Sequence, residues 1–179
     1  SLVDAKKLDI SLQPDRWKFD DNPYIISGPC SVESEEMIVD WAHKMKDVGV
    51  NALRGGAYKP CTYPITEEVG SNGWKEGLRE DGLRYLRIAS VESGLPIVSE
   101  IMDASQINEL SMDCIDIVQV GTRNFQNYTL LDALGELDIP ILLKRGTWGT
   151  IDEILGAVER ILVGGNEKVA ICLRGVVGA

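Results

Sequence analysis

Residues 49–60 of this 179-residue chain are GVNALRGGAYKP, and they contain the unit on which the fold prediction depends. Gly49 can end an amphipathic helix, Val50–Arg54 fits a short buried strand, and the two glycines after Arg54 permit a sharp turn. Similar apolar runs recur, separated by amphipathic segments of about a dozen residues. The runs are Tyr24–Ser27, Val50–Arg54, Ile97–Ser99, Ile115–Val120, Ile141–Leu143 and Val169–Leu173. This alternation predicts an α/β protein with repeated β/α units around a parallel sheet.

Helix start and stop signals fall between these runs in a regular order. Ser34 precedes two acidic residues, and both Asp103–Gln106 and Thr150–Glu153 match the capping-box pattern. Three glycines stand at expected helix ends, namely Gly94, Gly135 and Gly164. Six β/α steps without a sign of sheet reversal favour a TIM-type barrel over a doubly wound sheet, although periodicity alone does not separate the two. We predict a barrel domain over 21–179, preceded by an N-terminal arm or hairpin at 1–20.

Composition excludes several classes of function. The formal net charge of -10 and the absence of a basic stripe argue against a nucleic-acid partner. The sequence has no run of about 18 apolar residues and no apolar leader, so we expect no membrane partner and no secretion. Four irregularly spaced cysteines are typical of reduced thiols in a cytoplasmic protein.

Cations stand at or just after the ends of most predicted strands, in spite of the acidic composition. They are Arg54, Lys59, Arg123, Lys144, Arg145 and Arg174. Any one of them could extend into solvent or pair with a carboxylate. Together, however, they would lie around one opening, because the carboxyl ends of parallel strands meet at the same edge of the sheet. Ligands of parallel α/β proteins bind at this edge. The mixture of arginine and lysine predicts an anionic ligand that carries both phosphate and carboxylate.

Cys30 follows the first predicted strand. A buried apolar cysteine is the common reading of such a thiol, and a metal ligand or a nucleophile are the functional alternatives. A nucleophile needs a base, and the only histidine, His43, is expected in the middle of the first helix, far from the strand ends. A metal thiolate is therefore the stronger functional interpretation.

Five motifs together resemble the type I family of 3-deoxy-D-arabino-heptulosonate 7-phosphate (DAHP) synthases. In order, they are GPCS at 28–31, RGGAYKP at 54–60, GTRN at 121–124, LKRG at 143–146 and CLRG at 172–175. The resemblance implies a (β/α)8 barrel that condenses phosphoenolpyruvate with erythrose 4-phosphate and releases phosphate, the first step of the shikimate pathway. It also implies a divalent metal ion of the Mn, Fe, Co or Zn class.

The same resemblance implies roles for individual residues. Glu100 would lie near the reacting carbons and orient the water, and Lys59 would also donate a proton. Cys30 would be one metal ligand, and Thr62 would contact the phosphate of the aldose. The residues that would hold phosphoenolpyruvate are Arg54, Lys59, Arg123, Lys144 and Arg174.

Two departures from the family pattern matter. Cys61 stands where the family commonly has an arginine for the aldose phosphate, and a Cys30–Cys61 disulfide is less favoured than free thiols. The chain also stops after the sixth strand, whereas the family continues through two more β/α units that carry a histidine, a glutamate and an aspartate as metal ligands. We therefore expect about six of the eight units, an inactive isolated chain, and self-association into a homo-oligomer through two open sheet edges.

Two other functions remain as alternatives. One is a 3-deoxy-manno-octulosonate 8-phosphate synthase, which uses the same enol phosphate with another aldose, although RGGAYKP at 54–60 fits that family less well. The other is a non-catalytic module that binds phosphometabolites.

Overall fold

The computed structural model describes residues 23–61 and 77–175, so the predicted arm at 1–20 and Thr62 lie outside the described residues. The strands are β1 (Ile26–Ser27), β2 (Ala52–Arg54), β3 (Ile97–Glu100), β4 (Ile117–Val120), β5 (Ile141–Lys144) and β6 (Val169–Cys172). The α-helices are α1 (Glu35–Asp47), α2 (Glu80–Ser93), α3 (Glu109–Cys114), α4 (Tyr128–Gly135) and α5 (Ile151–Val163). Two 3-10 helices, η1 (Ala104–Gln106) and η2 (Thr122–Asn124), follow β3 and β4. No helix in these residues is long and apolar enough to cross a membrane.

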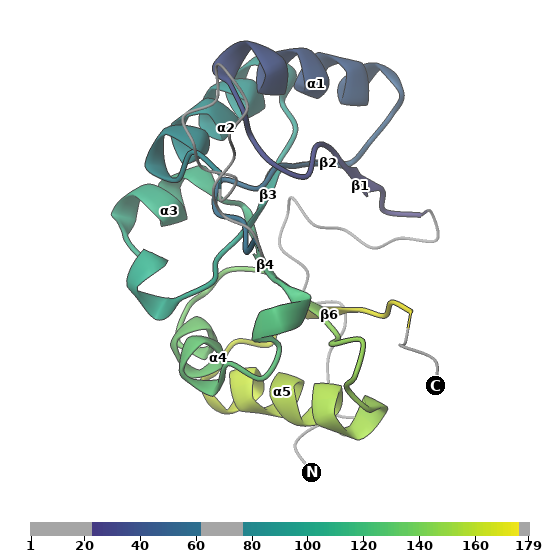
Figure 1. Cartoon of the computed structure of the whole chain (residues 1–179), viewed down its shortest axis with the longest axis vertical. Helices are drawn as coiled ribbons and strands as arrows, with labels where there is room; N and C mark the ends of the chain where they lie inside the picture. The colour runs from purple at the N-terminus through teal and green to yellow at the C-terminus, as the bar shows by residue number, and fades with distance from the viewer. Residues whose placement is uncertain (1–22, 62–76, 176–179) are drawn as a thin grey trace.

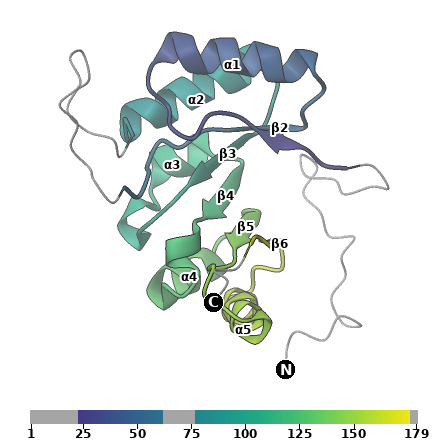
Figure 2. The same cartoon turned by 45° about the vertical axis from the view of Figure 1, so that its right-hand side comes forward.

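The six strands form one parallel sheet in the order β1-β2-β3-β4-β5-β6, so each strand pairs with its neighbours in the sequence. The sheet curls, and the helices follow one another along its outer side (Figure 1). The second view shows the same curl, with α1 and α2 at one end and α4 and α5 at the other (Figure 2). This sequential order without reversal is that of a half-barrel, which confirms the predicted α/β barrel-type fold. Self-association through the two sheet edges stays a prediction.

The core consists of two layers because successive strand residues point to opposite faces of the sheet. The outer layer is large and packs Leu53, Ile97 and Val118 against the helices. The inner layer is small: Ala52, Val98 and Ile117 form its buried centre. Partly buried residues complete this inner layer, namely Tyr24, Ile26, Leu142 and Ala170. The inner layer forms an apolar base beneath the residues that end each strand.

Most of the predicted helix boundaries are confirmed. Ser34 accepts a hydrogen bond from the Met37 amide at 3.1 Å, and Gly94 ends α2 in the left-handed conformation at φ 72°. The Thr150–Glu153 capping box is complete, since Thr150 Oγ1 accepts from the Glu153 amide at 3.1 Å and Glu153 Oε2 accepts from the Thr150 amide at 2.8 Å.

Two boundary predictions are wrong. Asp103–Gln106 does not open an α-helix: Asp103 caps only the 3-10 turn η1, and Gln106 Oε1 accepts from the Met102 amide instead. Asn108 caps the following helix through the Ser111 amide at 3.0 Å. Gly135 is the last residue of α4 and Glu136 is the C-cap, while the glycine permits close packing against α5. A Cβ on Gly135 would lie 2.8 Å from the Ile161 carbonyl oxygen of α5.

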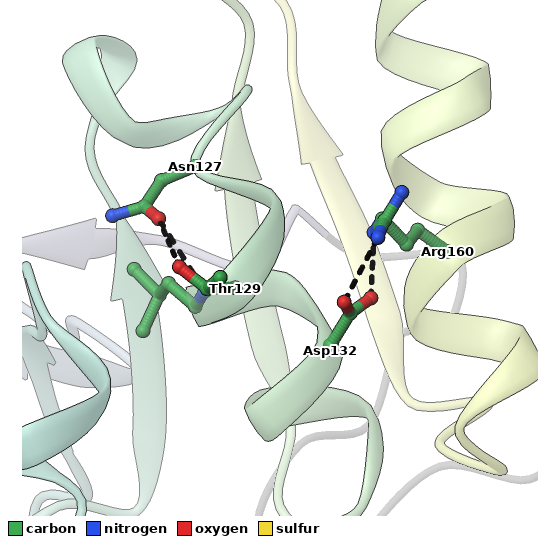
Figure 3. Close-up of polar contacts among 5 residues, drawn as sticks. Asn127, Thr129, Asp132 and Arg160 are labelled. Atoms are coloured by element: carbon green, nitrogen blue, oxygen red, sulfur yellow. Dashed lines mark hydrogen bonds and ion pairs between the residues drawn. The ribbon is translucent and has the colours of Figure 1, made fainter.

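A polar contact on the outer surface also joins α4 and α5. Figure 3 shows Arg160 of α5 reaching Asp132 of α4, with Nε and Nη2 donating to the two carboxylate oxygens at 2.6 and 2.9 Å. Asn127 caps α4 beside it and accepts from the Leu130 amide at 3.4 Å. The bidentate geometry fixes the two helices side by side at their exposed edge.

We expect Thr150→Ala to lower the free energy of unfolding by about 1 kcal/mol, because the Glu153 amide at the start of α5 loses its acceptor and the Glu153 carboxylate loses the Thr150 hydroxyl. Urea denaturation followed by circular dichroism measures this loss. Thr150→Ser is the matched control and should retain most of the stability, because serine keeps the capping oxygen. Equal losses in the two variants would contradict a capping role.

Candidate functional site

A cavity of about 400 Å³ lies at the carboxyl ends of the strands. It is lined by all seven predicted site residues that the structure describes, namely Cys30, Arg54, Lys59, Glu100, Arg123, Lys144 and Arg174. Thr62, the predicted contact of the aldose phosphate, lies outside the described residues. The topology therefore brings together residues that are up to 144 positions apart in the sequence, from Cys30 to Arg174 (174 − 30 = 144).

The two-residue period of the strands explains which side chains reach the cavity. Arg54 follows Ala52 by two positions on β2, and Lys144 follows Leu142 by two positions on β5. In each strand the first residue of the pair belongs to the inner apolar layer and the second lines the cavity. Glu100 stands in the same relation to Val98 on β3. The apolar base and the polar cavity are thus successive layers of the same inner face.

Glu100 lies beside Gln119 of β4, its partner in the strand register. Gln119 Nε2 donates to Glu100 Oε2 at 2.8 Å, whereas the buried Oε1 of Glu100 has no partner among the described residues. Burial raises the pKa of Glu100, although the Gln119 hydrogen bond and the charges of Lys144, Arg54 and Arg123 act in the opposite direction. Glu100 is therefore a carboxyl group that can take up a proton more readily than an exposed glutamate.

Gly121 makes room for this carboxyl group. A Cβ at position 121 would lie 2.1 Å from Glu100 Oε1, well inside the van der Waals distance. The backbone of Gly121 has an ordinary φ of -67°, so the constraint on this position is space rather than conformation. The glycine that precedes η2 therefore keeps the unpartnered oxygen of Glu100 in place.

The cations crowd one another. Burial lowers the pKa of Lys144, and the positive charges of Arg54 and Arg174 lower it further, while Cys172 and Glu100 oppose the shift. Among the described residues, the cavity lining contains five cationic side chains and one carboxylate, that of Glu100. A bound dianion or trianion would relieve this excess of positive charge.

The guanidinium groups in the cavity lining contact neutral atoms. Arg123 Nη1 donates to the Pro60 carbonyl at 3.3 Å, Arg174 Nη1 donates to Thr122 Oγ1 at 2.5 Å, and Arg54 Nη2 lies 4.0 Å from Cys30 Sγ. Within residues 23–61 and 77–175, none of these arginines forms an ion pair with a carboxylate. Neutralisation by surface acids therefore does not account for the cluster.

Arg145 departs from the expectation that all strand-end cations share one mouth. It follows Lys144 by one position, so its side chain leaves the opposite face of the strand. The side chain is buried, and its Nη1 and Nη2 donate to the carbonyl oxygens of Gly149 at 2.7 Å and Arg174 at 2.5 Å. Arg145 is not among the residues that line the cavity.

The described residues do not fit a complete metal centre. Cys30 is an exposed thiol at the cavity, and no disulfide joins the four cysteines. In the described part of the chain, no three His, Cys, Asp or Glu side chains lie close enough to share a metal ion. His43 is on α1 and contacts Glu92 of α2 at 3.3 Å, on the helical surface as predicted. A single thiolate does not fix a divalent cation.

Several lining residues were missed by sequence reasoning, namely Tyr58, Ser99, Gln119, Thr122 and Thr147. Gln119 had a recognisable signal, because it is a polar residue two positions after Ile117 within an otherwise apolar strand. Ser99 lies outside that inward pattern and braces the loop after β2, since its Oγ accepts from the Ala57 amide at 3.4 Å. Thr122 lies within the GTRN motif at 121–124, and Thr147 directly follows LKRG at 143–146, but neither motif indicated a role for its hydroxyl.

Comparison with known proteins shows which family has this sequence and fold. The model of the DAHP synthetase I family matches residues 8–179. The chain is 43% identical over 152 residues to phospho-2-dehydro-3-deoxyheptonate aldolase of Thermotoga maritima, which covers 85% of this chain and 42% of the relative. A 2-dehydro-3-deoxyphosphooctonate aldolase of Syntrophotalea carbinolica is 28% identical over 151 residues, covering 84% and 54% of the two chains.

Solved structures give the same result. The crystal structure of the Thermotoga maritima DAHP synthase superposes with a TM-score of 0.75 at 40% identity, covering 87% of this chain and 42% of that one. A truncated form of the same enzyme gives a TM-score of 0.72 at 39% identity, covering 87% and 52%. The chain spans about half the length of the curated relatives it matches.

We expect Glu100→Gln to stabilise the fold at neutral and alkaline pH. Because the folded-state pKa of Glu100 is raised, its contribution to stability is fully present below the unfolded pKa of about 4.3 and is lost as pH rises through the folded value. Glutamine keeps the acceptor for Gln119 and never ionises. Urea midpoints should therefore favour the variant at pH 8 and converge toward the wild type at pH 4.

The exposed Glu167→Gln is the matched control, because water solvates its charge in both states. A gain for Glu100→Gln that is the same at pH 4 and pH 8 would show that ionisation is not its cause.

Proposed function

The chain belongs to the DAHP synthetase I family, and from that premise we propose that it serves the condensation of phosphoenolpyruvate with erythrose 4-phosphate. This reaction opens the shikimate pathway and releases phosphate. The observation that carries the proposal is the cavity in which five cations from β2, β4, β5, β6 and the segments that follow them gather around Glu100, the one carboxyl group among its described lining residues. Its charge and its position in a parallel barrel fit a small ligand with both phosphate and carboxylate.

In this proposal, Arg54, Lys59, Arg123, Lys144 and Arg174 hold phosphoenolpyruvate. Arginines can bind carboxylate or phosphate oxygens in pairs, and lysines supply compact charges. Because these cations line one cavity at the strand ends, they would fix the enol phosphate in place and stabilise its negative charge through the reaction.

The proposed reaction has two steps. The enol electrons of phosphoenolpyruvate form a bond between its C3 and the aldehyde carbon of the aldose, and the aldehyde oxygen takes up a proton. Water then bonds to C2 and loses a proton, the bond between C2 and the phosphate ester oxygen breaks to release phosphate, and the new C2 hydroxyl loses its proton as the ketone forms. Lys59 is the proposed proton donor, and Glu100, which lines the same cavity, is the residue proposed to orient the water.

The metal requirement belongs to the family, whose members are generally metal-dependent. Cys30 is the proposed contribution of these residues to a metal site. The described residues do not complete such a site, so the side chains of this chain contribute binding, orientation and proton transfer to the proposed reaction.

Two alternatives are separable by experiment. The relatives named 2-dehydro-3-deoxyphosphooctonate aldolase are 28% identical or less among those compared, against 43% for the heptonate enzyme, so the octulosonate reaction is not favoured. Phosphate release from phosphoenolpyruvate should be measured with divalent metal and either erythrose 4-phosphate or arabinose 5-phosphate. Release with the four-carbon aldose alone supports the proposed reaction, and tight binding without release supports a binding module.

We expect Arg123→Ala to weaken phosphoenolpyruvate binding by roughly 10- to 100-fold, because the anion would lose charge-assisted hydrogen bonds to the guanidinium group. Isothermal titration calorimetry at fixed ionic strength measures this affinity. Arg160→Ala removes the same charge from the α4–α5 surface and is the matched control, which should bind as the unmodified chain does. Equal losses in both variants would mean that only net charge matters.

We expect Lys59→Met to abolish phosphate release in any preparation of this chain that is active, while phosphoenolpyruvate still binds with reduced affinity. The measurement is turnover at saturating phosphoenolpyruvate, so that weaker binding does not lower the rate. Unchanged turnover would remove Lys59 from the chemical steps.

A further inference from the structure

Arg145 connects two loops at the carboxyl edge of the sheet. Its Nη1 donates to the Gly149 carbonyl in the loop between β5 and α5, and its Nη2 donates to the Arg174 carbonyl after β6. Because the two carbonyl oxygens belong to different loops, two separate N–H groups must reach them, and the two terminal nitrogens of a guanidinium group have this spacing. Arg145 therefore holds the backbone of Arg174, a residue 29 positions later in the sequence.

Stability does not explain this arrangement. Arg145 is only 7% exposed, its Nε is buried without a partner, and its side chain forms no ion pair within the described residues. A buried cation that contacts only carbonyl oxygens bears a desolvation cost that an apolar side chain of similar size would avoid. What the Arg145 side chain provides in return is a fixed position for the Arg174 backbone.

The other end of Arg174 is held as well. Its Nη1 donates to Thr122 Oγ1 at 2.5 Å, and Thr122 belongs to η2 after β4. Arg174 itself is exposed, and a long exposed side chain would otherwise sample many rotamers. Contacts from β4 and β5 thus restrain both the backbone and the guanidinium of a residue that follows β6.

Resting on the proposed function, we propose that Arg145 and Thr122 are positioning residues that aim Arg174 at the anion in the cavity. Arg145 lies outside the cavity lining and acts through the Arg174 backbone. Thr122 sets the direction of the Arg174 guanidinium. Fixing the side chain before the ligand arrives removes an ordering cost from binding.

The test is a double-mutant cycle on phosphoenolpyruvate affinity, measured by calorimetry at fixed ionic strength. The four proteins are the unmodified chain, Arg145→Lys, Arg174→Gln and the double variant. Lysine keeps the charge at position 145 but has one nitrogen in place of the fork. We expect Arg145→Lys to weaken binding by about 5- to 10-fold, and the double variant to bind no more weakly than Arg174→Gln alone.

The Thr122 side chain gives a second cycle that leaves the buried cation in place, and it applies even if Arg145→Lys fails to fold. Thr122→Val removes only the hydroxyl and should weaken binding by a few-fold, whereas Thr122→Ser should restore it. The loss should again disappear when Arg174 is replaced by glutamine.

The outcomes separate the inference from the function on which it rests. If the unmodified chain binds phosphoenolpyruvate and either no loss occurs or the losses add to that of Arg174→Gln, the positioning role is overturned and the proposed function stands. If the unmodified chain binds no phosphoenolpyruvate, the proposed function is overturned, and this inference with it.

Discussion

The alternation of side chains along parallel strands is the constraint from which the site follows. At the carboxyl end of β5, Lys144 points into the curled sheet, and the next residue, Arg145, leaves on the opposite side. A shift of one residue in the strand register would exchange these two cations. The same period places Glu100 above Val98, and Gln119 above Ile117, so the apolar base of the half-barrel fixes which polar groups reach the ligand.

Lys144 and Glu100 occupy positions in the cavity that disfavour their charged forms, so these two side chains do not serve the stability of the fold. Burial moves the pKa of Lys144 down and that of Glu100 up, so each group is biased toward its neutral form. Their mutual attraction opposes both shifts but does not cancel them. In the proposed function, an anion binds here because the cost of burying these charges is met in folding, and the large outer layer of aliphatic residues supplies the stability that offsets this cost.

How much of this could be predicted depends on whether the cause is local in sequence. Strand positions and the Thr150 capping box follow from patterns a few residues long, and both were predicted. The Asp103–Gln106 pattern is equally local, but Gln106 Oε1 accepts from the Met102 amide and not from the Asp103 amide, and Asn108 caps the helix instead. Arg145 and Gly135 could not have been interpreted correctly, because their partners, Arg174 and Ile161, lie 29 and 26 residues further along the chain. The cation cluster was predictable because parallel topology brings all strand ends to one edge.

Anion binding and metal binding therefore differ in how they depend on the barrel. The proposed phosphoenolpyruvate ligands follow strands β2, β4, β5 and β6, which belong to one continuous sheet, and their positions are set by pairings between neighbouring strands. Cys30, after β1, is the single predicted metal ligand among the described residues, and these residues contain no group of three or more His, Cys, Asp or Glu side chains that could hold a metal ion. A half-barrel can thus assemble a cation cradle by local pairing alone, whereas a metal ion needs donors that converge on one point from across the barrel. In the proposed function, binding of the enol phosphate therefore depends on the register of the six strands and on the contacts that hold Arg174, and not on donors from the far side of a barrel.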